Sequence, residues 1–290
     1  NDLELAEWCL AHGANPNAGP PRAQTLPQQS LHAQALQSGL PEMAALLERF
    51  GAKTSGSTVQ QDAFRAACFR LDRAGAQRLA QAKPEYLLDP APMRKAAEQD
   101  RADVIELLLD LGMSPDIEDP KEGNQRPLHA AAYSNAARAA KVLIQAGAEI
   151  DNRESNHHAT PLGFAIWSEA WDAIEMIAPR SREVWNLVFL GKVERLREVL
   201  VEKPELAKSV SSEGETLLMQ LPDDDGKALE IARLLLSHGA NPSARNMAGL
   251  SAADLARKRG LEEVAALLES PAPSVSVIDA PIAADENRRE

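Results

Sequence analysis

The amino-acid sequence predicts an all-α fold in which pairs of short helices repeat along the chain. Two stretches far apart, residues 10–17 (LAHGANPN) and 236–243 (LSHGANPS), are almost identical. Further runs with apolar residues at helical spacing also end in glycine, and a second helical run of small residues precedes them. Glycine adopts the left-handed conformation that ends many helices without a steric penalty, so these glycines mark helix ends.

The length and charge of the chain limit the classes of function. The chain has 290 residues, of which 44% are hydrophobic, and a formal charge of -12. This charge repels phosphate, so we expect no nucleic-acid partner. No run of about eighteen apolar residues predicts a membrane span, and no signal peptide is visible. We expect a cytoplasmic protein, although the chain begins at Asn1 inside a repeat, which gives the missing signal peptide little weight.

Within the repeats, each helix has recognisable start and end signals. Helices are expected to end at residues 49–52, 110–113 and 145–148. Short first helices of small residues are predicted at residues 126–132 and 160–166. Thr160 can accept a hydrogen bond from a free backbone amide, and Pro161 can occupy the first helical position, where its missing N–H costs nothing. Alanines in these helices allow a neighbouring helix to approach closely.

This pattern resembles the ankyrin repeat, a unit of about 33 residues. It consists of a turn, a short helix, a tight reversal, a longer helix and a glycine at the end. The degenerate units in particular resemble bacterial ankyrin-repeat proteins. The resemblance implies an ankyrin-repeat solenoid with short β-turn fingers over residues 1–270, in about nine units of which the first is partial. Residues 271–290 have no periodicity and are expected to form a disordered tail or linker.

The family pattern Thr-Pro-Leu-His-x-Ala-Ala-x-x-Gly also locates the reversal inside each helix pair. The resemblance puts this reversal at Gly39, Asp100, Asn135, Glu169 and Gly260. Asn and Asp tolerate the left-handed conformation better than most residues, whereas Glu169 is a clear departure from the pattern. The units at residues 64–87 and 188–206 are degenerate, because Pro stands where the second helix would end in Gly.

The histidines do not form a catalytic or metal-binding pattern. The resemblance gives structural places to four of the six, namely His12, His32, His129 and His238. His157 and His158 remain, at the tip of a predicted finger. On an extended tip their side chains point to opposite faces, so we expect contact with a partner rather than a chelating pair.

Other chemical motifs are also missing from the sequence. Cys9 and Cys68 lie in apolar helical patterns without metal-ligand spacing, and are expected to be structural thiols. The acidic run at residues 223–225 lacks the spacing of an EF-hand loop. Neither a phosphate-binding glycine loop nor a nucleophile elbow or HExxH motif is present. The sequence therefore predicts no catalytic residue, no cofactor and no metal site, and the protein is not expected to be an enzyme.

The resemblance implies a concave face, built from first helices and finger tips, that binds proteins. The two residues before each reversal point into it. The predicted partner-binding residues are Phe69, Arg70, Glu98, Gln99, Tyr133, Ser134, Trp167, Ser168, Phe189, Asp223 and Asp224, with His157 and His158 at a finger tip. Gln37, Ser38, Leu190, Lys258 and Arg259 complete the series.

Aromatic residues are concentrated in this series. The chain has four Trp, two Tyr and five Phe residues, and four of these eleven fall at one column of eight positions. Truncation of a real aromatic anchor costs about 2 to 4 kcal/mol of binding. The alternative is that Phe69 and Phe189, in degenerate units, are one residue out of register and belong to the core. Trp171 and Trp185 are expected to fill space around the unit that lacks its glycine.

The charges at the edge of this face suggest the chemistry of the partner. The finger at residues 116–125 is long and strongly polar. With Glu98, Asp223 and Asp224 it would make part of the rim acidic, which favours a partner with Lys or Arg at its periphery. Rim charges of this kind change the association rate and its salt dependence more than the final affinity.

These observations predict a non-catalytic protein–protein interaction scaffold. Adaptor, regulator, and inhibitor or immunity-type roles all fit, because the fold fixes the shape of a surface and not its partner. The alternative is an accessory domain that recruits a substrate or partner for a larger enzyme, with the catalytic region before Asn1 or after Glu290.

Overall fold

The computed structural model describes residues 2–17, 30–37, 40–52 and 59–270. The chain divides into two compact units, residues 1–187 with 194–196 and residues 188–193 with 197–290. Regular secondary structure in the described residues is α-helix or 3-10 helix, as predicted, apart from three isolated β-bridges. The expected reversal at Gly39, the side chains of Gln37 and Ser38, and the tail at 271–290 lie outside the described residues.

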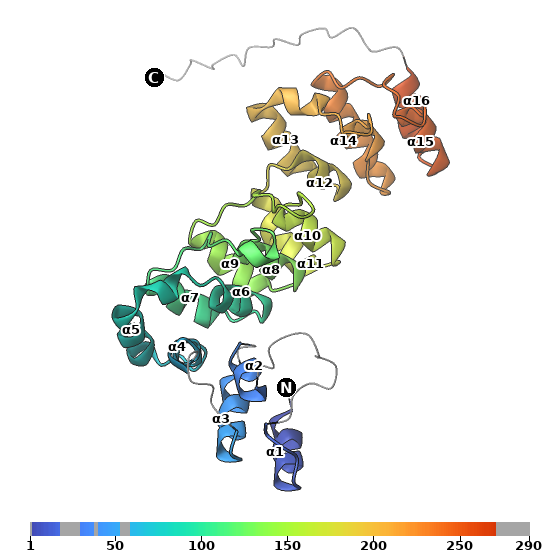
Figure 1. Cartoon of the computed structure of the whole chain (residues 1–290). Helices are drawn as coiled ribbons and strands as arrows, with labels where there is room; N and C mark the ends of the chain where they lie inside the picture. The colour runs from blue at the N-terminus through green and yellow to red at the C-terminus, as the bar shows by residue number, and fades with distance from the viewer. Residues whose placement is uncertain (1, 18–29, 38–39, 53–58, 271–290) are drawn as a thin grey trace, which may run out of the picture. The chain divides into compact units, whose positions relative to one another are not determined.

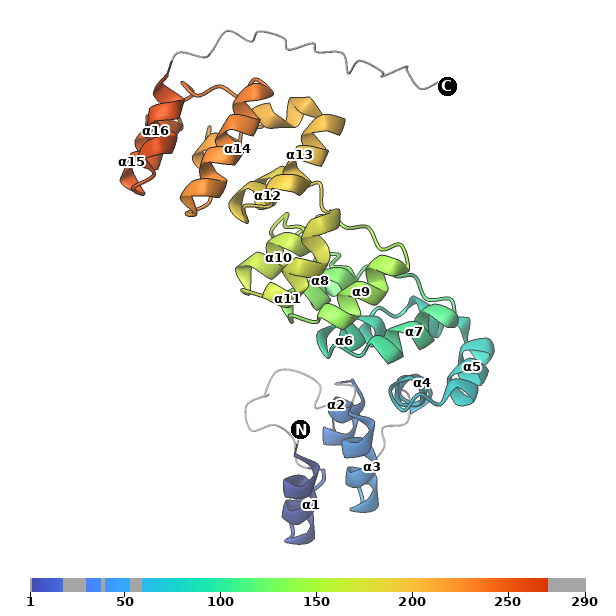
Figure 2. The same cartoon turned by 180° about the vertical axis from the view of Figure 1, so that it is seen from behind.

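The first unit consists of successive helix pairs. Its helices are α1 (Leu3–Ala11), α2 (Leu31–Gln37), α3 (Pro41–Arg49), α4 (Val59–Phe69), α5 (Arg73–Ala82), α6 (Ala91–Glu98), α7 (Ala102–Asp110), α8 (Pro127–Tyr133), α9 (Ala137–Gln145), α10 (Pro161–Trp167) and α11 (Trp171–Ile177). Short 3-10 helices are η1 (Pro84–Leu88), η2 (Pro120–Glu122) and η3 (Ala178–Arg180). The first helices α6, α8 and α10 pack in one row, and the second helices α7, α9 and α11 pack in another (Figures 1 and 2).

The second unit repeats this arrangement with one irregular member. The boundary between the units passes through α12 (Val184–Phe189) and α13 (Val193–Glu202). Beyond it lie η4 (Pro204–Lys208), η5 (Leu217–Met219), α14 (Asp225–Ser237), α15 (Ala252–Lys258) and α16 (Glu262–Glu269). In the irregular member, the 3-10 helix η5 takes the place of a first α-helix.

Four predicted reversals lie in the described residues, and all four have the predicted left-handed backbone. The φ angle is +53° at Asp100, +53° at Asn135, +55° at Glu169 and +78° at Gly260. The degenerate units contain the same turn, at Leu71 (φ +58°) and Gly191 (φ +64°). The glycines at the ends of the second helices are also left-handed: Gly13, Gly51, Gly112, Gly147 and Gly239.

The starts of the first helices follow the sequence signals. The Thr160 hydroxyl accepts a hydrogen bond from the Gly163 N–H at 3.2 Å, and Pro161 opens α10. His129 is buried and joins two adjacent repeats, as predicted. Its Nδ1 accepts from the Arg126 N–H at 3.2 Å, and its Nε2 lies 3.3 Å from the Ala159 carbonyl oxygen.

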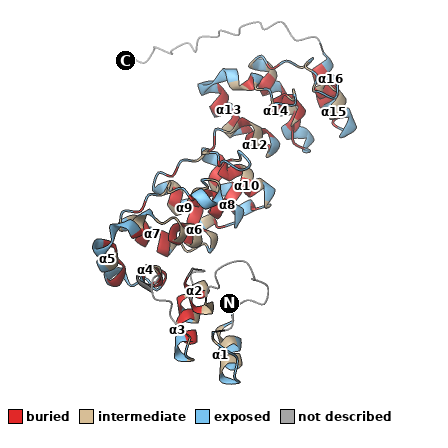
Figure 3. Ribbon diagram, viewed as in Figure 1, coloured by how far each residue is buried: buried red, intermediate tan, exposed pale blue. Residues whose placement is uncertain are grey.

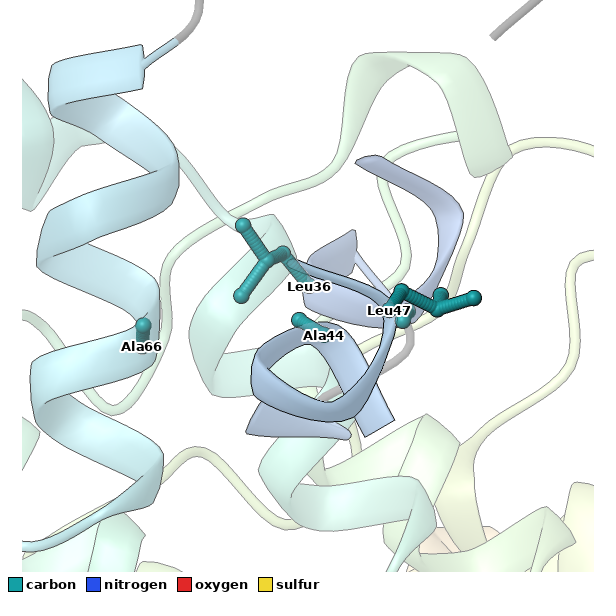
Figure 4. Close-up of a cluster of buried hydrophobic side chains, with 5 residues drawn as sticks. Leu36, Ala44, Leu47 and Ala66 are labelled. Atoms are coloured by element: carbon teal, nitrogen blue, oxygen red, sulfur yellow. The ribbon is translucent and has the colours of Figure 1, made fainter. Parts of the chain in front are cut away.

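Small apolar residues fill the space between helices. Buried residues run along α6, α8 and α10, whereas α1 has none (Figure 3). Figure 4 shows one cluster, in which Leu36 of α2, Ala44 and Leu47 of α3, and Ala66 of α4 pack together. Each helix pair therefore buries its apolar face against its neighbours rather than in a central core.

The expectation that Trp171 fills space near its irregular unit is wrong. Its side chain is 62% exposed, because it stands at the first position of α11, directly after the reversal. Trp185 is half-buried. Cys68 is buried as predicted, and burial raises the pKa of its thiol to about 12, which disfavours the reactive thiolate.

Candidate functional site

A groove in the first unit brings together several of the predicted partner-binding residues. It has a volume of about 410 Å³, and we call it the aromatic groove. Its lining residues are Arg94, Glu98, Glu122, Gln125, Ala130, Tyr133, Ser134, His157, Phe164 and Trp167. The first helices α6, α8 and α10 supply one wall, and two fingers, at residues 116–125 and 151–160, supply the other.

Two exposed rings dominate the helix wall. Tyr133 and Trp167 are the last residues of α8 and α10, and their side chains are 51% and 70% exposed. Their ring centroids lie 5.8 Å apart with the planes tilted by 46°. Phe164 is buried and lies edge-on to both rings, at 6.3 Å from Tyr133 and 6.4 Å from Trp167. Because this ring supports the exposed pair, the two large apolar faces are held ready for contact.

The finger at residues 151–160 adds a fourth ring, from His157. The His157 ring centroid lies 6.2 Å from that of Trp167 and 6.3 Å from that of Phe164. Glu154 fixes this finger. Its side chain is fully buried and accepts hydrogen bonds from the backbone N–H groups of Asn156 at 2.7 Å and His157 at 2.7 Å.

The charge of Glu154 is stabilised by these bonds. Burial would raise the pKa of its carboxyl group, but the N–H donors of Ala159, Asn156 and His157 lower the pKa below its usual range. A carboxylate that accepts several backbone N–H groups keeps its charge and orders the turn around it. The position of the His157 ring thus depends on Glu154.

The finger at residues 116–125 is fixed by a network of charges. Arg94 of α6 donates from Nε to Asp119 at 3.1 Å and from Nη1 to Glu98 at 2.5 Å. Burial alone would lower the pKa of Arg94, but Glu98 and Asp119 raise it. The Ser155 N–H donates to the Gly123 carbonyl at 2.7 Å, so the two fingers are joined to each other.

Of four further predicted residues, one lines this groove. Ser134 lines it, and Gln99 is exposed at the end of α6. The Ser168 hydroxyl donates to the Phe164 carbonyl at 3.0 Å, so it bonds its own helix. Phe189 is 53% exposed at the equivalent position before Gly191, in the second unit.

Phe69 is a correction to the prediction. It stands at the expected position before the reversal at Leu71, yet its side chain is only 3% exposed. The Arg101 guanidinium lies 6.0 Å from its ring centroid and donates to the Phe69 carbonyl at 3.3 Å. The register is therefore right, but the ring is part of the core. Arg70 lines a different cavity, of about 490 Å³, with His32 and Asp62.

Three carboxylates of the predicted acidic rim each contact a group of their own chain. Glu98 pairs with Lys95 at 2.7 Å as well as with Arg94. In the second unit, Asp223 pairs with Arg259 at 2.6 Å, and Asp224 caps α14 by accepting from the Lys227 N–H at 2.8 Å. The Asp223 side chain nevertheless remains 92% exposed, and the acidic rim stays a prediction.

The finger tip that carries His157 and His158 is a turn and not an extended segment. Residues 155–157 form the turn, and His158 is left-handed with a φ of +54°. The His158 carbonyl accepts from Arg153 at 2.6 Å. Only His157 lines the aromatic groove. The extended tip was predicted because the hydrogen bonds of the buried Glu154 carboxylate, which form the turn, have no sequence signal.

Five groove residues were not among the predicted partner-binding residues: Arg94, Glu122, Gln125, Ala130 and Phe164. Phe164 lies one helical turn before Trp167, a spacing that places both on one face. Arg94 precedes Glu98 by four residues in the same way. Glu122 and Gln125 lie in the polar finger already singled out, but the sequence does not indicate which of its residues face the helices.

Two further properties concern the described part of the chain. Its His, Cys, Asp and Glu residues form no group of three or more that could hold a metal ion. None of its helices combines the length and the apolar composition needed to cross a membrane.

Comparison with known proteins gives both sequence and fold similarities. YahD of Escherichia coli (strain K12), whose name describes an ankyrin repeat protein, is 28% identical over 193 residues, which is 62% of this chain and 94% of YahD. An ankyrin repeat domain of Acinetobacter baumannii AYE has a TM-score of 0.48 and 25% identity, over 62% of this chain and 97% of that chain. A structure of the predatory endopeptidase Bd0816 from Bdellovibrio bacteriovorus in complex with the immunity protein Bd3460 gives a TM-score of 0.45 and 19% identity, over 60% of this chain and 96% of the matched chain.

The fold is that of a repeat protein, with stacked helix pairs, left-handed reversals, projecting fingers and a surface groove. Residues 93–186, which contain every residue that lines the aromatic groove, match the family model for ankyrin repeats in three copies. This part of the chain therefore consists of ankyrin repeats. Ankyrin repeats are generally modules for protein–protein interaction and not for catalysis.

Proposed function

We propose that this protein is a non-catalytic scaffold that binds a protein partner in the aromatic groove. The observation that carries the proposal is the pair of exposed rings, Tyr133 and Trp167, which touch each other above the buried Phe164. Exposed large aromatic residues that are held by their neighbours are typical of binding hot spots, because little side-chain entropy is lost on binding.

The two fingers give the groove its second wall. A partner segment between the walls would contact rings on one side and the polar groups of Glu122, Gln125 and His157 on the other. Protein interfaces commonly have an apolar centre with a polar rim of this kind. Phe189 of the second unit is a further candidate contact, whose contribution is to be measured separately.

The test is capture of the partner from the organism that produces the protein. The full chain serves as bait, and bound proteins are identified by mass spectrometry. Tyr133→Ala and Trp167→Ala should each weaken binding by about 2 to 4 kcal/mol. Trp171→Ala is the matched control, because Trp171 is as exposed as the groove rings but does not line the groove.

Thermal unfolding of the same variants separates binding from folding. Both groove variants should unfold close to the wild-type temperature, since half or more of each ring is exposed. A partner that binds all three variants equally would contradict the proposal. Loss of stability with unchanged affinity would make Tyr133 and Trp167 packing residues.

A further inference from the structure

We propose that the aromatic groove receives an arginine side chain of the partner, whose guanidinium stacks on Tyr133 and Trp167 and pairs with Glu122. This inference rests on the proposed function and adds the chemistry of the partner. It follows from the charges around the groove, from the flat faces of its rings and from one unpaired carboxylate.

The charges around the groove favour a cationic guest. The groove and the network that supports it contain two cations, Arg94 and Lys95, and three carboxylates, Glu98, Asp119 and Glu122. Arg94 is held by Glu98 and Asp119, and Lys95 by Glu98. An anionic partner would meet Glu98 and Glu122 and would find Arg94 already engaged.

Glu122 is the carboxylate left for a guest. It is exposed on the 3-10 helix η2, and in the described part of the chain its carboxylate makes no ion pair within 4.0 Å. Its charge acts on Arg94 only at longer range. Because η2 is anchored by the Asp119 side chain, which accepts from the Lys121 N–H at 3.1 Å, the position of Glu122 is defined by the finger.

The opposite wall presents the surface on which a cation stacks well. The negative face of an aromatic ring attracts a cation placed above it, and Trp is the most effective ring. Tyr133 and Trp167 are exposed and adjacent, and both line the same groove as Glu122. Two rings and one carboxylate are therefore among the groups that line the groove around a bound cation.

Arginine fits these walls better than lysine. The guanidinium is planar, stacks on aromatic rings, and presents several N–H donors in a fork that matches a carboxylate. The lysine ammonium is a compact, strongly hydrated charge, which loses more hydration in such a site. The inference thus commits to arginine and predicts a weaker response to lysine.

The experiment follows the tryptophan indole N–H signals of the full chain by NMR. The probe is acetyl-glycyl-arginyl-glycine amide, and its citrulline counterpart is the neutral control of the same shape. The Trp167 signal is assigned by its loss in Trp167→Phe. We expect the arginine peptide to shift the Trp167 signal and leave the Trp171 signal in place, and the citrulline peptide to bind about tenfold more weakly.

Two variants test the proposed partners of the guanidinium. Glu122→Gln should weaken binding of the arginine peptide about fivefold. Glu106→Gln, which removes an exposed carboxylate on α7, should leave it unchanged. Trp167→Leu should reduce binding more than Trp167→Phe, because phenylalanine retains an aromatic face. Because both variants lack the Trp167 signal, calorimetric titration measures their binding.

The inference is overturned if the citrulline peptide binds as well as the arginine peptide, if a glutamate peptide binds better, or if Trp167 does not respond. Equal binding of lysine and arginine would remove the preference for arginine. These failures differ from failure of the proposed function. A captured partner that needs Trp167 but tolerates Glu122→Gln would leave the scaffold proposal standing and remove the arginine inference.

Discussion

The Asp100 carboxylate accepts a hydrogen bond at 2.8 Å from the backbone N–H of Ala139. Ala139 lies in the first turn of α9, in the following repeat. Asn135 shows the same relationship one repeat later, where its Oδ1 accepts from the Ala173 N–H of α11 at 3.1 Å. Neither α9 nor α11 receives a hydrogen bond from its own N-cap side chain. In these two cases, the residue at the reversal of one repeat therefore caps the second helix of the next repeat.

This relationship explains why two reversal positions are not glycine. Asp100 and Asn135 both have a left-handed backbone, which costs an L-residue free energy that glycine would not lose. The cap that each side chain supplies is worth about 1 kcal/mol and offsets this cost. Glu169 has the same backbone but caps no helix in the described residues, so its strain is not compensated.

Substitutions at these reversals should therefore have opposite effects. Glu169→Gly should stabilise the protein by about 0.5 to 1 kcal/mol, because it relieves a left-handed backbone and loses no cap. Asn135→Gly should be neutral or destabilising, since the lost cap outweighs the relief. Urea unfolding measures both. Equal gains at the two positions would contradict the capping role of Asn135.

Two buried threonines provide a matched pair of predictions. The Thr160 hydroxyl accepts from the Gly163 N–H and from Asn186 Nδ2, each at 3.2 Å. The Thr216 hydroxyl is buried and has no hydrogen-bond partner among the described residues. Thr160→Val should cost about 1 to 2 kcal/mol, whereas Thr216→Val should be neutral or stabilising, because an unsatisfied hydroxyl is removed.

Denaturant midpoints of these two valine variants provide the test. A similar loss at both positions would mean that the Thr216 hydroxyl contributes to stability. No loss at Thr160 would mean that the start of α10 does not need its cap.

Glu154→Gln should disturb the groove through the finger that carries His157. An amide keeps one acceptor oxygen and gains an NH2 group that faces backbone donors, so the cost should be about 2 kcal/mol. We expect faster amide exchange at residues 154–159 and weaker partner binding. Glu118→Gln, on the other finger, is a control that leaves this turn intact. Unchanged exchange in Glu154→Gln would show that the carboxylate does not order the finger.

His129 should make the stability of the first unit sensitive to acid. Burial lowers its pKa below the ordinary value of 6.5. As the pH falls through 6.5, the unfolded chain takes up a proton that the folded chain does not, so the free energy of unfolding decreases. The decrease continues until the pH passes the lowered pKa. His129→Asn should flatten this slope, and His158→Asn, at an exposed site, should not.

Sequence patterns predicted the local elements well because helix signals are local. The reversals at Asp100, Asn135 and Glu169 followed from the resemblance to the ankyrin pattern. The cap at Thr160 followed from its residue type and its place before Pro161. The column of aromatic residues was also in the correct register. The surroundings of each ring could not be predicted from the sequence, because residues of neighbouring repeats supply them.

Phe69 and Trp167 illustrate this limit. They occupy equivalent positions in their repeats. Arg101 of the next repeat lies over Phe69, while Trp167 remains exposed. The ion pair between Arg94 and Asp119, 25 positions apart in sequence, likewise has no local signal. Contacts between repeats decided which predicted residues share the groove.

The most direct test of the central claim is amide hydrogen exchange of the full chain with and without its captured partner. We predict that protection on binding is concentrated in the two fingers and in α8 and α10, around Tyr133 and Trp167. Protection confined to the second helices α7, α9 and α11, with the aromatic groove unchanged, would contradict the account.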